Sequence, residues 1–119
     1  MSLTHEQVAE AFSRHDFAAA YDHLAEDVRW SLVGAEQCEG REAVVEWCER
    51  SVDYLATVTT RFSKFRVVSG GDHVVVDSTA EYTAEGEQPS VVASCDIYRF
   101  AGGRVAEITS YNIELGGNP

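Results

Sequence analysis

One carboxylate in the middle of an apolar stretch is the residue best suited to chemistry in this sequence. Asp96 lies within residues 91–115, which read V-V-A-S-C-D-I-Y-R-F-A-G-G-R-V-A-E-I-T-S-Y-N-I-E-L. Removing a carboxylate from water is costly unless the group is paired or neutralised, and burial without a cation raises its pKa. Such a group exchanges protons closer to neutral pH, so Asp96 is the candidate general acid or base.

The segment around Asp96 predicts two long strands joined by a tight turn at residues 101–103. Gly-Gly between apolar runs is typical of a hairpin, because glycine accepts positive φ without steric cost. Side chains alternate between the two faces of a strand. The face that we expect to point into a hollow carries Ser94, Asp96, Tyr98 and Phe100 on the first strand and Ile108, Ser110 and Asn112 on the second.

Polar and aromatic side chains expected around Asp96 predict a cavity for an apolar molecule with a polar group. Convergent hydroxyl and amide groups orient ligands in such cavities, and aromatic side chains form their walls. The candidate ligand-contacting residues are Trp30, Ser31, Tyr54, Tyr82, Ser94, Tyr98, Ile108, Ser110 and Asn112. The competing interpretation makes Asp96 a core group that hydrogen-bonds a serine, a tyrosine or Trp30.

The other reactive side chains lack the spacing of a metal site or a nucleophile. The histidines are scattered, at His5, His15, His23 and His73, so no metal site is expected. An odd number of cysteines without a C-x-x-C pair, at Cys38, Cys48 and Cys95, predicts reduced thiols and a cytoplasmic location. The sequence has no phosphate-binding loop or nucleophile elbow, so no cofactor is expected.

Length and charge limit the partners further. The 119 residues predict one domain over 1–119, long enough to bury a core without disulfides. The net charge of −11, from 20 acidic and 9 basic residues, argues against nucleic acid, anionic membranes and polyanionic ligands. No apolar run approaches the length of a membrane span.

The elements that must position Asp96 begin with helices. Thr4 and Gln7 fit a capping box that starts the first helix. Asp16 is expected to cap a second short helix, whose apolar stripe is Phe17, Ala20, Tyr21 and Leu24. A short strand over 28–33 and a turn at 38–40 lead into an amphipathic helix that reaches Leu55.

After residue 57 the hydrophobic pattern changes to a period of two and predicts strands over 58–68 and 73–83 before the hairpin. This order predicts an α+β fold, with helices packed on one face of a curved antiparallel sheet. The outer face would carry Cys95, Ile97, Tyr111 and Ile113 with no helix left to cover it. An exposed apolar sheet face marks an interface, so we expect a two-fold homodimer through this face.

The whole chain resembles the SnoaL-like members of the nuclear transport factor 2-like superfamily. The resemblance rests on the helical start, D-V-R-W-S-L-V-G at 27–34, the turn to Gly40 before a helix, and C-D-I-Y-R-F-A-G-G-R-V-A-E-I-T-S-Y-N at 95–112. It implies a cone-shaped sheet wrapped around N-terminal helices, a cystatin-like α+β roll. The superfamily includes polyketide cyclases, ketosteroid isomerases, epoxide hydrolases and non-catalytic dimerisation modules, so the fold is better defined than the function.

The resemblance also implies roles for single positions. The strand that carries the oxyanion-hole aspartate of ketosteroid isomerases lines up with residues 96–100, which places Asp96 at that aspartate. Ser31 takes the place of the general base in those isomerases, and Val8 lies near the position of their oxyanion-hole tyrosine. Ser110 replaces an acid of the epoxide hydrolases. Cyclases of the family rely on a pocket acid that moves a proton near a polyketide carbonyl, a role open to Asp96.

Two functions follow from these residues. The first is a cofactor-independent isomerase or cyclase that uses Asp96 for acid–base chemistry on a small, apolar, carbonyl-bearing molecule of polyketide or steroid type. The alternative is a non-catalytic ligand-binding or dimerisation module in which Asp96 is structural. The sequence shows no second catalytic group beside Asp96, so both functions stay open.

Overall fold

Helices precede a long antiparallel meander, as the sequence predicts. A computed structural model describes residues 3–115. Its elements are α1 (His5–Ser13), the 3-10 helix η1 (Phe17–His23), β1 (Leu24–Leu32), β2 (Glu36–Glu39), α2 (Arg41–Leu55), β3 (Val58–Gly70), β4 (His73–Ala84), β5 (Ser90–Ala101) and β6 (Arg104–Leu115). The predicted α+β fold is therefore confirmed.

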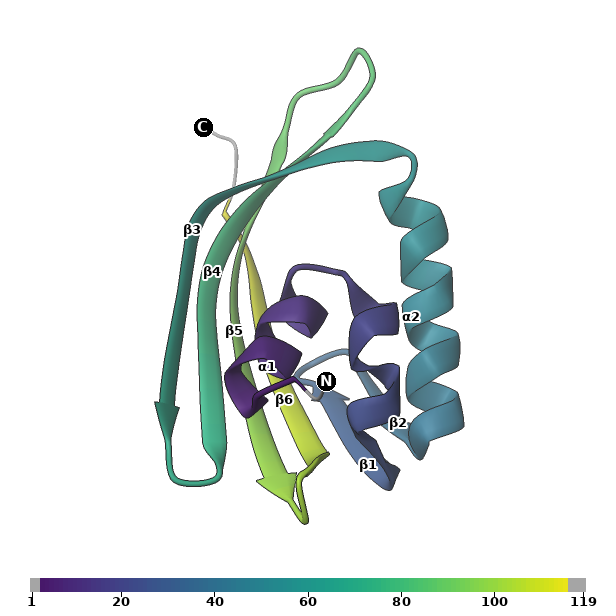
Figure 1. The fold of residues 1–119 in the computed structure, drawn as a ribbon. Helices are drawn as coiled ribbons and strands as arrows, with labels where there is room; N and C mark the ends of the chain where they lie inside the picture. The colour runs from purple at the N-terminus through teal and green to yellow at the C-terminus, as the bar shows by residue number, and fades with distance from the viewer. Residues whose placement is uncertain (1–2, 116–119) are drawn as a thin grey trace.

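The strands form one six-stranded sheet in the order β2-β1-β6-β5-β4-β3. Strands β3 to β6 pair as an antiparallel meander, whereas β1 runs parallel to β6 and carries β2 on its other edge. All three helical segments lie on one side of the curved sheet, with α1 close to β4 and β5 and α2 beside β1 and β2 (Figure 1). This side is the inner face, and the opposite side is the outer face.

Specific contacts fix both the start and the end of α1. Thr4 Oγ1 accepts a hydrogen bond from the backbone N–H of Gln7, and Gln7 Oε1 accepts one from the N–H of Thr4, which confirms the capping box. Near the other end, the buried ring of Phe12 meets the rings of Phe17, Trp30 and Tyr98 edge-on, with centroids 5.0, 5.0 and 6.0 Å away. Burying a side chain of this size stabilises the fold by about 1.5–3 kcal/mol. This packing holds the last residues of α1 against β1 and β5.

The turn between β5 and β6 has the predicted form. Gly102 and Gly103 both adopt positive φ, at 60° and 80°, and they link the paired residues Ala101 and Arg104. Two successive positive φ angles are the requirement of a type I′ hairpin turn. The register of this hairpin decides which side chains of β5 and β6 reach the inner face.

Three predictions for the first half of the chain are wrong in detail. The second helix is a 3-10 helix, and the Asp16 side chain makes no capping hydrogen bond to it. Leu24, expected on the stripe of that helix, begins β1, because its backbone pairs with Val105 of β6. The expected turn at 38–40 is partly a strand, since Cys38 pairs with Trp30 at the edge of the sheet. The last two errors have a tertiary cause, because distant strands recruit residues with weak local patterns.

Candidate functional site

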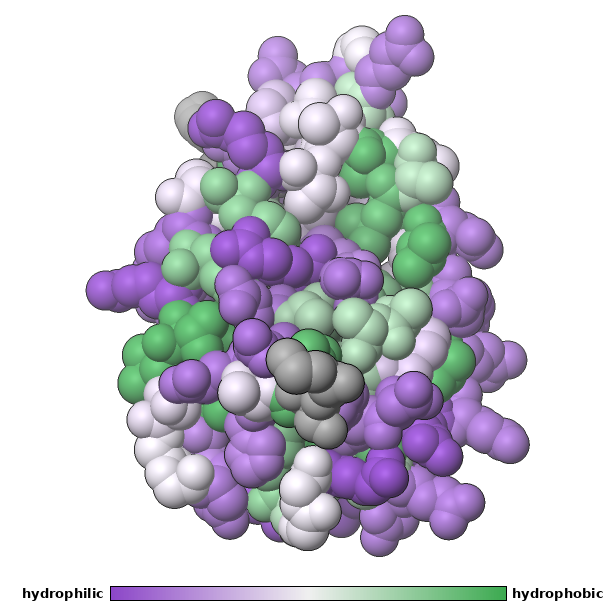
Figure 2. All heavy atoms as spheres, in the orientation of Figure 1, coloured by the Kyte–Doolittle hydropathy of each residue, from purple (hydrophilic) through white to green (hydrophobic). Residues whose placement is uncertain are grey.

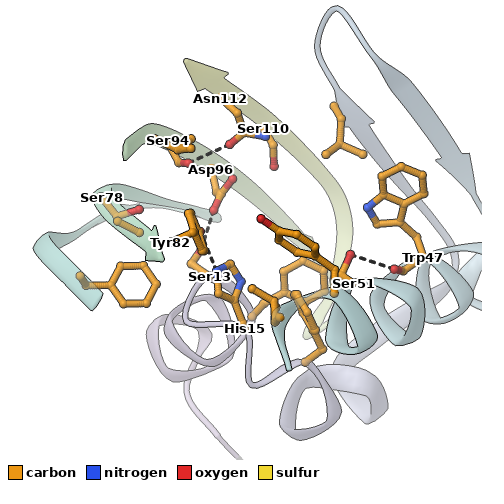
Figure 3. A pocket seen from close by; sticks show the side chains of 18 of the residues that line it. Ser13, His15, Trp47, Ser51, Ser78, Tyr82, Ser94, Asp96, Ser110 and Asn112 are labelled. Atoms are coloured by element: carbon orange, nitrogen blue, oxygen red, sulfur yellow. Dashed lines mark hydrogen bonds between the residues drawn. The ribbon is translucent and has the colours of Figure 1, made fainter. Parts of the chain in front are cut away.

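A cavity of about 290 Å³ opens between the inner face of the sheet, the end of α1 and the inner side of α2 (Figure 3). Hydrophobic side chains gather near the C-terminal end of α2, on a face of the molecule that is otherwise mostly hydrophilic (Figure 2). The predicted residues that line the cavity are Trp30, Tyr54, Tyr82, Ser94, Asp96, Ser110 and Asn112. The structure thus brings most of the predicted site together from α2 and four strands.

Three predicted residues do not line this cavity. Ser31 pairs with Thr109 and lies on the outer face, because its neighbour Trp30 takes the inner position beside Ile108. Tyr98 and Ile108 are on the inner face, but they pair with each other one row closer to the β5–β6 turn, and both side chains are fully buried. Tyr98 instead contacts the site through a hydrogen bond to Ser13.

The carboxylate of Asp96 is reached by a directed chain of hydrogen bonds from β5 through α1. Ser13 Oγ donates to Asp96 Oδ2 at 2.8 Å and lies 2.6 Å from the hydroxyl of Tyr98. A serine hydroxyl has one proton, so Tyr98 must donate to Ser13 while Ser13 donates to Asp96. Ser13 and Tyr98 are buried, which leaves few alternative partners for either hydroxyl.

A second chain reaches Asp96 from β1. The indole N–H of Trp30 donates to Ser110 Oγ at 2.9 Å. Indole nitrogen is a donor only, so the proton of Ser110 remains free to turn toward Asp96, and the Ser110 hydroxyl lowers the pKa of that carboxyl. Ser13 and Ser110 therefore both stabilise the ionised form of Asp96.

Burial acts on Asp96 in the opposite direction and is the larger influence. Loss of solvent raises the pKa of the Asp96 carboxyl above its ordinary value, while the hydrogen bonds from Ser110 and Ser13 lower it by less. No cation opposes this shift from the same strand, because Arg99 is paired with Glu107 and belongs to the alternate set of β5 side chains. The raised pKa expected from the sequence is confirmed.

A polar row lies next to Asp96, one inner-face pair further from the β5–β6 turn. Ser78 on β4 pairs with Ser94 on β5, which in turn pairs with Asn112 on β6. Ser94 Oγ donates to Asn112 Oδ1 at 2.8 Å, so the amide nitrogen of Asn112 remains available to a ligand. The floor of the cavity therefore carries hydroxyl and amide groups on three neighbouring strands.

His15 is the functional candidate that sequence reasoning missed. It follows α1 and lines the cavity, where its Nε2 lies 2.9 Å from the hydroxyl of Tyr82. Burial lowers the pKa of His15 and raises the pKa of Tyr82, whose phenol is shifted further by the negative charge of Asp96. No local pattern in the sequence marked His15, because its partner Tyr82 lies 67 residues later in the chain.

Helix α2 supplies the wall opposite the sheet. Trp47 lines the cavity with Tyr54 and Leu55. Ser51 also faces the cavity, but its hydroxyl is bonded to the backbone oxygen of Trp47 at 3.0 Å (Figure 3). This wall is therefore mainly aromatic and apolar.

Other sites for chemistry are few in the part of the chain that the structure describes. Residues 3–115 contain no group of three or more His, Cys, Asp or Glu side chains placed to hold a metal ion. Cys48 is buried, and desolvation raises the pKa of its thiol to about 12, which disfavours a thiolate nucleophile. None of the described helices combines the length and apolar character that crossing a membrane requires.

Solved structures share this fold. A nuclear transport factor 2-like protein of unknown function from Cytophaga hutchinsonii is 26% identical, with a TM-score of 0.81 over 92% of this chain and 96% of that chain. An LEH-like epoxide hydrolase from M. tuberculosis is 19% identical, with a TM-score of 0.69 over 91% of this chain and 81% of that chain. A candidate polyketide cyclase from Xanthomonas campestris is 24% identical, with a TM-score of 0.68 over 87% and 83%.

The family comparison covers most of the chain. No curated protein matches the sequence. The model of the SnoaL-like domain matches residues 5–108, from the start of α1 into β6 and including Ser13, His15, Tyr82 and Asp96. The chain therefore belongs to the SnoaL-like family.

Proposed function

We propose that this protein binds a small, apolar, carbonyl-bearing molecule of polyketide or steroid type and moves a proton on it with Asp96, without a cofactor. The observation that carries the proposal is the state of Asp96. Its carboxyl group lines an aromatic cavity, its pKa is raised by burial, and a hydrogen bond from Ser13 holds it in place. A carboxyl group with a raised pKa takes and returns protons more readily near neutral pH.

The reaction class is a proton shift next to a carbonyl group. The ionised Asp96 would take a proton from the carbon beside the carbonyl, and the resulting enolate would receive a proton back at another carbon, as an isomerase requires, or attack an electrophilic carbon, as a cyclase requires. Ser13 holds the carboxylate during this step, and the Ser110 hydroxyl favours its ionised form. The candidate polyketide cyclase of the same fold is consistent with this class.

The same proposal includes a homodimer. Tyr111 and Ile113 are 45% and 62% exposed on the outer face of the sheet. On the same outer face, Cys95 of β5 pairs with Tyr111 of β6, and Ile97 pairs with Thr109. An apolar sheet face of this kind marks an interface, and a two-fold axis would let the patch meet its own copy.

A non-catalytic binding module remains the second candidate, and the serine contacts favour it. A hydrogen bond from Ser13, a second serine nearby and a buried position are also what a purely structural carboxylate needs. In that case the cavity would bind its ligand without changing it, and Asp96 would only fix the end of α1 against β5.

Proton exchange separates the two functions. We expect the protein to accelerate deuterium exchange in D₂O at the carbon beside the carbonyl group of 2-tetralone. Proton NMR measures the rate of this exchange. Asp96→Asn should lower the rate by about 10²–10⁴-fold, the range for a lost general acid or base. Asp53→Asn, at an exposed position of α2, is the matched control and should leave the rate unchanged. Tryptophan quenching by 2-tetralone without accelerated exchange would favour the binding module.

A further inference from the structure

The end of α1 has a histidine where helices usually have glycine. The N–H of Asp16 donates to the carbonyl oxygen of Ala11 at 2.8 Å, and the N–H of His15 donates to that of Phe12 at 3.0 Å. These bonds define a Schellman motif, in which the first residue after the cap takes the left-handed conformation that favours glycine. His15 takes it with φ of 72°, the one positive φ of a residue other than glycine in the described chain.

This strained conformation brings the imidazole ring to the cavity. The ring lies 5.6 Å from that of Phe17 and 5.7 Å from that of Phe62, and its Nε2 is 2.9 Å from the Tyr82 hydroxyl. Figure 3 shows His15, Tyr82 and Ser13 gathered beside Asp96. A side chain kept at the expense of backbone strain, next to a candidate catalytic group, points to a role in the site.

The protonation states of the pair determine what it can offer to a ligand. Burial keeps His15 neutral over a wider pH range, and the raised pKa of Tyr82 keeps its phenol protonated. A neutral imidazole that carries its proton on Nε2 donates to the Tyr82 oxygen. The phenol proton of Tyr82 is then free to point into the cavity.

We propose that Tyr82 is the second catalytic group of this site, donating a hydrogen bond to the carbonyl oxygen of the substrate, and that His15 is the residue that positions it. The inference rests on the proposed function of Asp96. Asp96 takes the proton as the carbon–hydrogen bond breaks, and that electron pair forms the carbon–carbon double bond. The carbonyl π pair moves to the oxygen, where the hydrogen bond from Tyr82 stabilises the enolate charge.

The hydroxyl of Tyr82 is tested with two ligands that differ by one oxygen. The aromatic 2-naphthol resembles the enol of 2-tetralone, and naphthalene lacks its hydroxyl group. We expect the protein to bind 2-naphthol about tenfold more tightly than naphthalene, which is the size of one good hydrogen bond. Tyr82→Phe should reduce the preference to less than about twofold. Tyr21→Phe is the matched control and should keep it, since Tyr21 is bonded to Glu49 outside the cavity.

The role of His15 is tested with two substitutions that suit its backbone. His15→Gly removes the ring and the backbone strain, and His15→Asn removes the ring but keeps a residue that tolerates left-handed φ. Both should lose most of the preference for 2-naphthol, while the melting temperature of His15→Gly stays equal to or above that of the wild type. A preference that survives in both variants would refute the positioning role.

These results separate the inference from the function on which it rests. If Asp96→Asn abolishes exchange of 2-tetralone but Tyr82→Phe keeps the preference for 2-naphthol, the proposed function stands and Tyr82 is not its second group. If exchange survives in Asp96→Asn, the proposed function fails whatever the naphthol result. Failure of both 2-naphthol and naphthalene to bind the wild type would refute both, since no flat apolar ligand would then enter the cavity.

Discussion

Ser13, at the end of the first helix, donates a 2.8 Å hydrogen bond to Asp96, which lies 83 residues later in the chain. Because Tyr98 must donate to the same serine oxygen, one hydroxyl connects a fully buried tyrosine to the candidate catalytic carboxylate. Ser13 therefore has two tasks, since it satisfies Tyr98 and it stabilises the ionised form of Asp96. Changes at Ser13 should affect both the fold and the proton affinity of the site.

Replacing Ser13 with alanine should raise the pKa of Asp96 further, because a hydrogen bond that favours the ionised form is lost. It should also lower the free energy of unfolding by about 1–3 kcal/mol, since the buried Tyr98 hydroxyl loses its acceptor. Carboxyl carbon NMR titration and urea denaturation measure the two effects. Ser51→Ala is the control, because the Ser51 hydroxyl bonds only within its own helix. An unchanged pKa of Asp96 in Ser13→Ala would contradict the stabilisation of its ionised form by Ser13.

Asp96→Asn should keep or increase the free energy of unfolding at pH 7. The folded pKa of Asp96 is raised above the ordinary value of 3.8, so the folded state binds the proton more tightly than the unfolded state. The stability that Asp96 contributes is therefore present below that ordinary value and is lost as pH rises through the folded pKa. Urea denaturation at pH 7 and at about pH 4 should show the gain of Asp96→Asn over the wild type shrinking as pH falls. A large loss of stability at pH 7 would identify Asp96 as a structural anion.

The tryptophan pair of the cavity should report ligand binding. Trp30 and Trp47 both line the cavity, so an apolar ligand that enters it should quench their fluorescence. Tyr82→Ala should weaken this binding by about tenfold, since the ligand loses both an aromatic contact and a hydrogen-bond partner. A panel of steroids, flat polyphenols and terpenoids provides the ligands. Absence of quenching across the panel would favour a role in dimerisation alone.

Ile97→Asp should convert the proposed homodimer into monomers, because a charge on the outer face would be desolvated at the interface. The measurement is light scattering at tens of micromolar protein. An interface of standard size stays formed at about this concentration. Val52→Asp, at a half-exposed position on α2 away from the sheet, is the control and should leave the mass unchanged. A monomeric wild type at that concentration would contradict the proposal.

The strands and the identity of the central acid were accessible from the sequence because they depend on local patterns. Alternation along residues 91–115 placed Ser94 and Asp96 on one face, and the glycine turn joined the two strands as expected. The pairing of Asp96 with Ser110 also depends on a register shift between Arg99 and Phe100. The direction of the Asp96 pKa shift also followed, since it needs only burial and the lack of a cation on the same face.

The partners of Asp96 and the second polar pair were decided by the tertiary structure alone. Ser13 and His15 lie far from Asp96 and Tyr82 in the sequence, and no local pattern distinguishes them from surface residues. Ser31 was misplaced for the same reason, because its face depends on the parallel pairing of β1 with β6. Local periodicity determines which side of its own element a residue occupies, whereas contacts between elements depend on how hydrophobic burial packs the whole chain.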